Sequence, residues 1–96
     1  MTTSAIHARA IDEIDDQLIK LLAQRFAHSR KIGEIKRAAG EPPYDPERLS
    51  SLIERFVMTS VDQGLPGGMA QQLISVILAQ VLVERVKGYQ SDAAKT

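Results

Sequence analysis

The feature of this sequence that most constrains its fold is a long helical pattern running from about residue 6 to about residue 39. No proline interrupts it, Gly33 is its one glycine, and Gly40 with the two prolines that follow ends it. Thr3 or Ser4 is expected to cap its start. At 1.5 Å per residue this helix is a rod of roughly 50 Å. The rest of a 96-residue chain is too short to cover such a rod, so the pattern predicts that a second copy completes the core.

A stiff linker and a shorter helical pattern follow. The linker GEPPYD contains two prolines, which fix their own backbone and hold the preceding residues out of the helical region, so we expect a turn. Asp45 stands where a helix N-cap is expected, and Pro46 at the first helical position. Apolar residues recur at helical spacing from Leu49 to Val57, which predicts a helix ending near Gly64.

A third helical pattern runs from Met69 to about Lys87 and carries apolar residues on more than one face, as a largely buried helix does. The sequence therefore predicts a single all-α domain over residues 1–96, with three helices per chain, one of them very long. Residues 1–5 and 90–96 have no such pattern and are expected to be disordered tails.

Cations interrupt the apolar stripes of all three helices. At about 100° per residue, Arg25 and Lys36 fall in the apolar sector of the segment that begins at Ile11. Arg85 lies on the apolar line of the third helix, and Arg48 lies at the edge of the apolar face of the second helix. A buried cation is costly unless it is paired, and acids are few in the predicted interior. A small polyanionic ligand would satisfy these charges, because arginine binds carboxylates with two donors and lysine supplies a compact charge.

Each of these residues also has a purely structural interpretation. Arg25 and Lys36 can bury their stems and extend their charged ends to water, and Arg85 can favour the dipole at the end of its helix. Glu84 is next to Arg85 but points to another side of the helix. Ser29 can bond back to the carbonyl one turn earlier. The joint occurrence of the cations favours the anion site.

The composition excludes several kinds of site. Lysine plus arginine and aspartate plus glutamate number 12 each, so the net charge of zero creates no overall field for nucleic acid or an anionic membrane. There is no cysteine, and His7 and His28 lack metal-ligand spacing. No nucleophilic triad, phosphate loop or carboxylate pair is present. We therefore expect no metal site and, if the protein is an enzyme, a reaction that depends on charge placement and orientation more than on proton transfer or covalent chemistry.

The expected location follows from two further absences. The N-terminus has no signal-peptide pattern, and no apolar run is expected to approach membrane-spanning length. The sequence therefore predicts a soluble, cytoplasmic protein that has neither nucleic acid nor membrane as a partner.

Four stretches together resemble the all-helical, AroQ-class chorismate mutases: IDEIDDQLIKLLAQR, GEIK, PYDPER and the closing helix. The resemblance covers about residues 8 to 86 without a gap. It implies an intertwined helical homodimer, whose long first helices span both protomers and form two equivalent active sites. It also implies an isomerase of aromatic amino acid biosynthesis in the shikimate pathway, which rearranges chorismate to prephenate without a cofactor.

The resemblance assigns roles to residues at matching positions. Arg25 would bind a substrate carboxylate, and Lys36 would reach a carboxylate and the ether oxygen. Asp45 and Arg48 would lie around the ring hydroxyl and a mobile loop. Arg85, which stands where the family usually has glutamine, would donate to the ether oxygen. Lys36, Arg85 and Arg25 are thus the predicted catalytic residues, and the ligand is a small dicarboxylate, chorismate or isochorismate.

Some positions depart from the family pattern. The arginine expected three residues before Ile11, which reaches the partner's site, is Ala8 here, and its neighbour Arg9 lies about 100° away around the helix. Arg9 replaces it only if the start of the helix shifts. The glutamate that contacts the ring hydroxyl is Leu49, and a serine near the end of the third helix is Val81.

These departures leave alternatives open. An apolar Leu49 resembles the isochorismate pyruvate lyases, relatives on the same fold that form salicylate and pyruvate, whereas the presence of Asp45 favours the mutase. A 4-amino-4-deoxychorismate mutase is a third enzymatic reading. Ala8 and Leu49 also permit a non-catalytic dimeric binding module. The sequence predicts chorismate mutase first, because most of the chain follows the common pattern.

Overall fold

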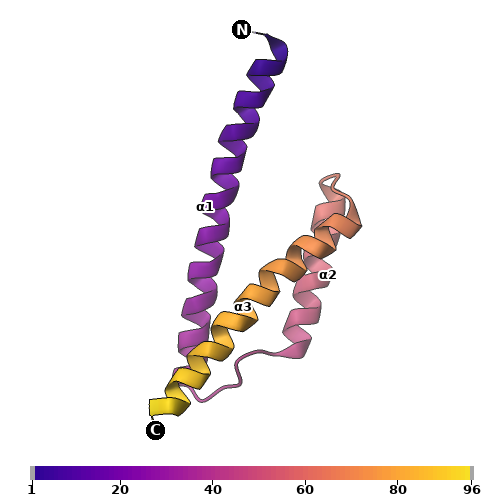
Figure 1. The fold of residues 1–96 in the computed structure, drawn as a ribbon. Helices are drawn as coiled ribbons and strands as arrows, with labels where there is room; N and C mark the ends of the chain where they lie inside the picture. The colour runs from indigo at the N-terminus through magenta and orange to yellow at the C-terminus, as the bar shows by residue number, and fades with distance from the viewer. Residues whose placement is uncertain (1, 96) are drawn as a thin grey trace.

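The computed structural model describes residues 2–95, with side chains through Ser91. Its three helices are α1 (Thr3–Ala38), α2 (Pro46–Asp62) and α3 (Gly67–Lys95), and no strand occurs among the described residues. The backbone of α3 contacts both α1 and α2, whereas no backbone contact joins α1 to α2 (Figure 1). The chain is therefore all-α with three helices, as predicted, and α3 holds the other two together.

Local sequence signals set the ends of α1 and α2 and the start of α2. Gly40 follows α1 and Gly64 follows α2, and both adopt the left-handed conformation, with φ of 72° and 88°. The residue after each glycine donates its N–H to the carbonyl five residues earlier, over 2.9 Å in both cases. At the start of α2 the Asp45 carboxylate accepts the N–H of Glu47 at 3.0 Å, and Pro46 occupies the first turn. The predicted cap and both predicted helix ends are confirmed.

The start of α1 differs by one or two residues from the expected cap. Thr2, rather than Thr3 or Ser4, is the N-cap, and its side-chain oxygen accepts the N–H of Ala5 at 3.1 Å. Any of the three hydroxyl residues satisfies the chemistry of the cap, so the sequence alone did not distinguish them.

The third helix is longer than predicted. It continues past Lys87 to Lys95, because the sequence after Gly88 contains no proline or further glycine that would end a helix. The helices thus extend into both segments expected to be tails, while residues 1 and 96 lie outside the described residues.

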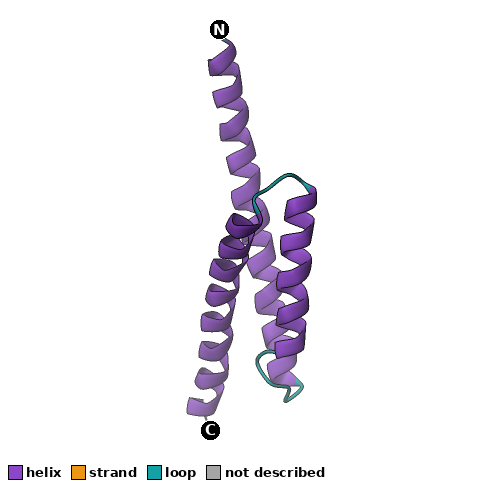
Figure 2. Ribbon diagram, turned by 90° about the vertical axis from the view of Figure 1, so that its right-hand side faces the viewer, coloured by secondary structure: helices purple, strands orange, loops and turns teal. Residues whose placement is uncertain are grey.

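The core of a single chain is small. Ile74, Ile77 and Leu78 of α3 are buried, and partly buried side chains of α1 and α2 pack against them. Most of the apolar stripe of α1 is uncovered: Ile14 is 59% exposed and Leu18 is 50% exposed. Figure 2 shows the reason, since the N-terminal half of α1 extends beyond the other two helices. The radius of gyration is 17.4 Å, against about 12.5 Å for a compact domain of this length.

α3 is long and apolar enough, over Gly67–Ser91, to cross a membrane by length and composition alone. The expectation that no apolar run approaches this length was wrong, because the aliphatic residues outweigh the glutamines between them. The core helix of a soluble protein passes the same test, and α3 packs against both of the other helices. Its length and composition are therefore weak evidence for a membrane span.

Candidate active site

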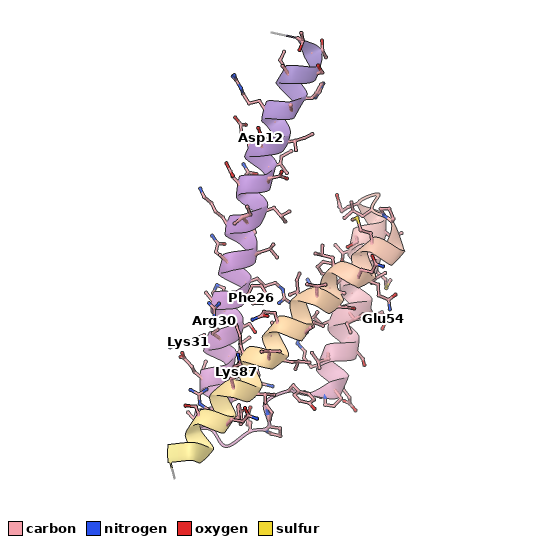
Figure 3. The ribbon with its side chains drawn as sticks, in the orientation of Figure 1. Asp12, Phe26, Arg30, Lys31, Glu54 and Lys87 are labelled. Carbon is pink, nitrogen blue, oxygen red and sulfur yellow. The ribbon has the colours of Figure 1, made fainter. Side chains whose placement is uncertain are left out.

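Arg85 lies where α1 and α3 cross. Its Nη2 donates to the Ser29 side-chain oxygen at 2.9 Å and to the Ser29 carbonyl at 3.0 Å, while Nη1 donates to the Pro43 carbonyl at 3.3 Å. The Arg85 side chain lies against Gly33, the buried residue of α1, where an added Cβ would lie 3.4 Å from Arg85 Nε. Figure 3 shows Arg30 of α1 and Lys87 of α3 near this crossing. The Arg85 guanidinium is thus half-buried and held by uncharged acceptors.

Arg85 lines a first recess, and a second recess, lined by cations, lies between α1 and α2. Arg25 of α1 and Arg48 of α2 line a groove of about 330 Å³ together with Arg55, and Phe56 supplies part of its apolar wall. Arg25 is half-buried, whereas Arg48 and Arg55 are exposed. Three guanidinium groups around one groove favour a ligand with negative charge.

Lys36 and Asp45 share a third recess, of about 320 Å³, at the end of α1. The linker between α1 and α2 forms its wall through Glu41, Pro42 and Tyr44. The Asp45 carboxylate caps α2 and forms no ion pair with Lys36 among the described side chains. Lys36 is half-buried here without a carboxylate partner.

The four predicted cations form no ion pair among the described side chains. The described side chains form two ion pairs, Arg30 with Glu84 at 3.4 Å and Lys31 with Glu34 at 3.5 Å. Neither involves Arg25, Lys36, Arg48 or Arg85. Glu84 faces α1 rather than its neighbour in the sequence, as its position on the helix predicted. Four cations on the three helices thus lack an ion pair, and a bound anion would offset their charge.

One chain does not bring Arg9 to this junction. Arg9 is exposed near the N-terminus of α1, and its separation of sixteen positions from Arg25 corresponds to about 24 Å along the helix. Arg25 with Arg48, Lys36 with Asp45, and Arg85 also line three separate recesses.

Sequence reasoning missed two residues near the predicted site. Arg55 follows Arg48 by two helical turns, and this spacing places both side chains on one face of α2. Ser29 does not bond back to its own helix but accepts from Arg85. The periodicity of α2 could have identified Arg55, whereas the contact of Ser29 depends on where α3 crosses α1.

Metal-binding side chains do not gather in the part of the chain that the structure describes. No group of three or more histidine, cysteine, aspartate or glutamate residues is placed to hold an ion within it. His7 and His28 are both exposed on α1.

The sequence was also compared with known proteins. The family model described as chorismate mutase type II matches residues 7–86. A chorismate mutase of Methanocaldococcus jannaschii is 30% identical over 84 residues, which cover 88% of this chain and 80% of that protein. A bifunctional chorismate mutase/prephenate dehydratase of Neisseria gonorrhoeae is 33% identical over 81 residues, which cover 82% of this chain.

The chain covers a much smaller share of the longer relatives. The aligned region is 21% of the Neisseria protein and 22% of the T-protein of Enterobacter agglomerans, which is 28% identical. It therefore corresponds to one segment of those proteins and to most of the Methanocaldococcus enzyme. The all-α fold, the surplus of cations at the helix junction and a family match over most of the sequence agree, and the chain belongs to the chorismate mutase type II family.

Proposed function

We propose that the protein rearranges chorismate to prephenate at a site formed by Arg25, Lys36, Arg48 and Arg85. The observation that carries this proposal is that these four cations come from all three helices and form no ion pair among the described side chains. A ligand with two carboxylates matches such a surplus of positive charge. Membership of the family supports the same reaction.

The reaction is unimolecular and needs orientation and charge stabilisation rather than a base or a nucleophile. Arg25 and Lys36 bind the carboxylates and hold the substrate in a compact conformation. Lys36 and Arg85 donate to the ether oxygen, where negative charge grows as the bond breaks. The contacts of Arg85 with Ser29 and Pro43 leave donors on Nε and Nη1 for this purpose.

The active form is a homodimer. The accessible surface of one chain is 7415 Å², whereas a compact monomer of this mass exposes about 5,500 Å². The excess of about 1,900 Å² per chain falls in the range of obligate homodimer interfaces. Much of the exposed apolar surface lies on the projecting half of α1, where Ile11 is 57% exposed and Ile14 is 59% exposed. A second α1 is the apolar partner of matching length.

In this dimer, Arg9 acts in the site of the partner subunit. Arg9 is too far from the cations of its own chain, and it stands on the segment that the second copy covers. An arginine at this point can bind a carboxylate of the substrate, which Ala8 cannot do.

A lyase acting on isochorismate is the second candidate, and Leu49 favours it. Leu49 packs against the core of Ile74, Ile77 and Leu78 and lines none of the three recesses that contain the predicted site residues. No carboxylate therefore stands at this position to accept the ring hydroxyl of chorismate. We assign Asp45, in the recess with Lys36, as the acceptor of this ring hydroxyl instead.

Product analysis distinguishes these functions. The purified protein is offered chorismate, isochorismate and 4-amino-4-deoxychorismate separately, and the products are identified by chromatography. We expect prephenate from chorismate. Salicylate and pyruvate from isochorismate, with no prephenate, would replace the mutase by the lyase. Absence of turnover of all three above the uncatalysed rates would leave a binding module.

A further inference from the structure

The linker between α1 and α2 is attached to α3 by two side chains. The Tyr89 hydroxyl donates to the Glu41 carbonyl at 2.6 Å, and Arg85 Nη1 donates to the Pro43 carbonyl at 3.3 Å. Tyr89 and Arg85 are one helical turn apart and therefore lie on the same side of α3. The linker passes beside the C-terminal half of this helix (Figure 1).

Few other hydrogen bonds hold the middle of the linker. Pro42 and Pro43 have no N–H to donate, and the backbone hydrogen bonds of the linker stop at Glu41, whose N–H closes the end of α1 on the Lys36 carbonyl at 2.9 Å. The next bond is the cap of α2 at Asp45. Between these two points Arg85 and Tyr89 of α3 supply hydrogen bonds to the linker.

The same linker separates Lys36 from Asp45 and forms the wall of their recess. Its conformation therefore sets how the ammonium group at the end of α1 lies relative to the carboxylate at the start of α2. Arg85 belongs to the proposed catalytic set. Tyr89 lines none of the three recesses that contain the predicted site residues and reaches the substrate only through the linker.

We propose that Tyr89 is a positioning residue, which holds the linker in the conformation that brings Lys36 and Asp45 to the substrate. This inference rests on the proposed function. Without the Tyr89 hydrogen bond, the linker occupies the competent conformation for a smaller fraction of the time. The apparent affinity for substrate falls in proportion to this population. Bound substrate restores the conformation, so the rate at saturation is retained.

The test is the variant Tyr89→Phe, which keeps the ring and removes the hydroxyl. We expect KM for chorismate to rise about fivefold, the factor that corresponds to one hydrogen bond of ordinary strength, with kcat within about twofold of wild type. Gln90→Ala is the matched control, because Gln90 is exposed on the same turn and its side chain forms no hydrogen bond with the other described side chains. It should leave KM and kcat unchanged.

A second measurement reports on the linker independently of activity. In Tyr89→Phe, amide hydrogen exchange at Glu41 should accelerate about fivefold. The Leu65 amide holds the equivalent position at the end of α2, bonded to the Ser60 carbonyl at 2.9 Å, and should exchange as in wild type. Equal acceleration at Glu41 and Leu65 would indicate general destabilisation and overturn the inference.

The two proposals fail in different ways. If wild type turns over no chorismate, the proposed function fails, and exchange at Glu41 still decides whether Tyr89 holds the linker. If wild type is active and Tyr89→Phe shows the wild-type KM, or loses kcat with KM unchanged, Tyr89 does not position the site.

Discussion

Glycine and arginine are matched twice where α1 crosses α3. Gly33 of α1 leaves room for the side chain of Arg85 of α3, and Gly88 of α3 leaves room for the guanidinium of Arg37 of α1. Each glycine thus lets an arginine of the opposite helix lie across the helix surface. Gly33 costs about 1 kcal/mol in helix propensity relative to alanine.

The size of the side chain at residue 33 should control activity through Arg85. The Cβ of Gly33→Ala would lie 3.4 Å from Arg85 Nε, an ordinary contact, so this variant should retain activity and raise Tm. Gly33→Leu should displace Arg85 from Ser29 and lower kcat/KM for chorismate at least about tenfold, because hydrogen bonds of a charged group are lost. Wild-type kcat/KM in Gly33→Leu would show that the position of Arg85 does not matter.

At the start of α2, one carboxylate is expected to serve both the helix and the substrate. Asp45 caps α2 through its contacts with the N–H groups of Glu47 and Arg48, and it lines the recess that contains Lys36. These two roles need different properties, since a cap requires only an oxygen acceptor, whereas the proposed contact with the ring hydroxyl requires the carboxylate.

Two substitutions of Asp45 separate these roles. Asp45→Ala should lower stability by about 1 kcal/mol and Tm by about 4–8 °C, and it should also reduce activity. Asp45→Asn preserves the cap and should keep the wild-type Tm, while kcat/KM for chorismate falls about tenfold. Equal losses of Tm in both variants, measured by thermal unfolding, would contradict the capping role.

The sequence was sufficient where neighbouring residues decide the structure. Asp45 with Pro46 predicted the start of α2, and Gly40 predicted the end of α1, because caps depend on a few consecutive residues. The hydrogen bonds of Arg85 to Ser29 and Pro43 could not be predicted, since periodicity places residues on a face but does not fix where two helices cross. The length of α3 was underestimated because a polar composition does not by itself end a helix.

The extended shape of the chain supports the proposal that the site is shared by two copies. Extents of 62 × 26 × 16 Å leave the N-terminal half of α1 without a neighbour in its own chain (Figure 2). Arg9 and Lys36 then belong to the same site only if they come from different subunits. A dimeric mass in sedimentation at micromolar concentration is the first requirement.

Mixing two variants tests whether Arg9 acts across the dimer. Arg9→Ala and Lys36→Ala should each have low activity alone. After unfolding and refolding together in equal amounts, half of the dimers are mixed and one of their two sites is intact, so about a quarter of the wild-type activity should return. If Arg9 acted in its own subunit, the mixture would be no more active than the separate variants.

The rate of chorismate consumption by wild type and by Lys36→Ala, both verified as folded dimers, tests the proposed cationic site. We predict that wild type forms prephenate and that Lys36→Ala loses at least about a hundredfold in kcat/KM, as expected when a donor to the developing charge is removed. Lys31→Ala, on the exposed side of the same helix, should match wild type. Near-wild-type activity of Lys36→Ala would contradict this account of the site.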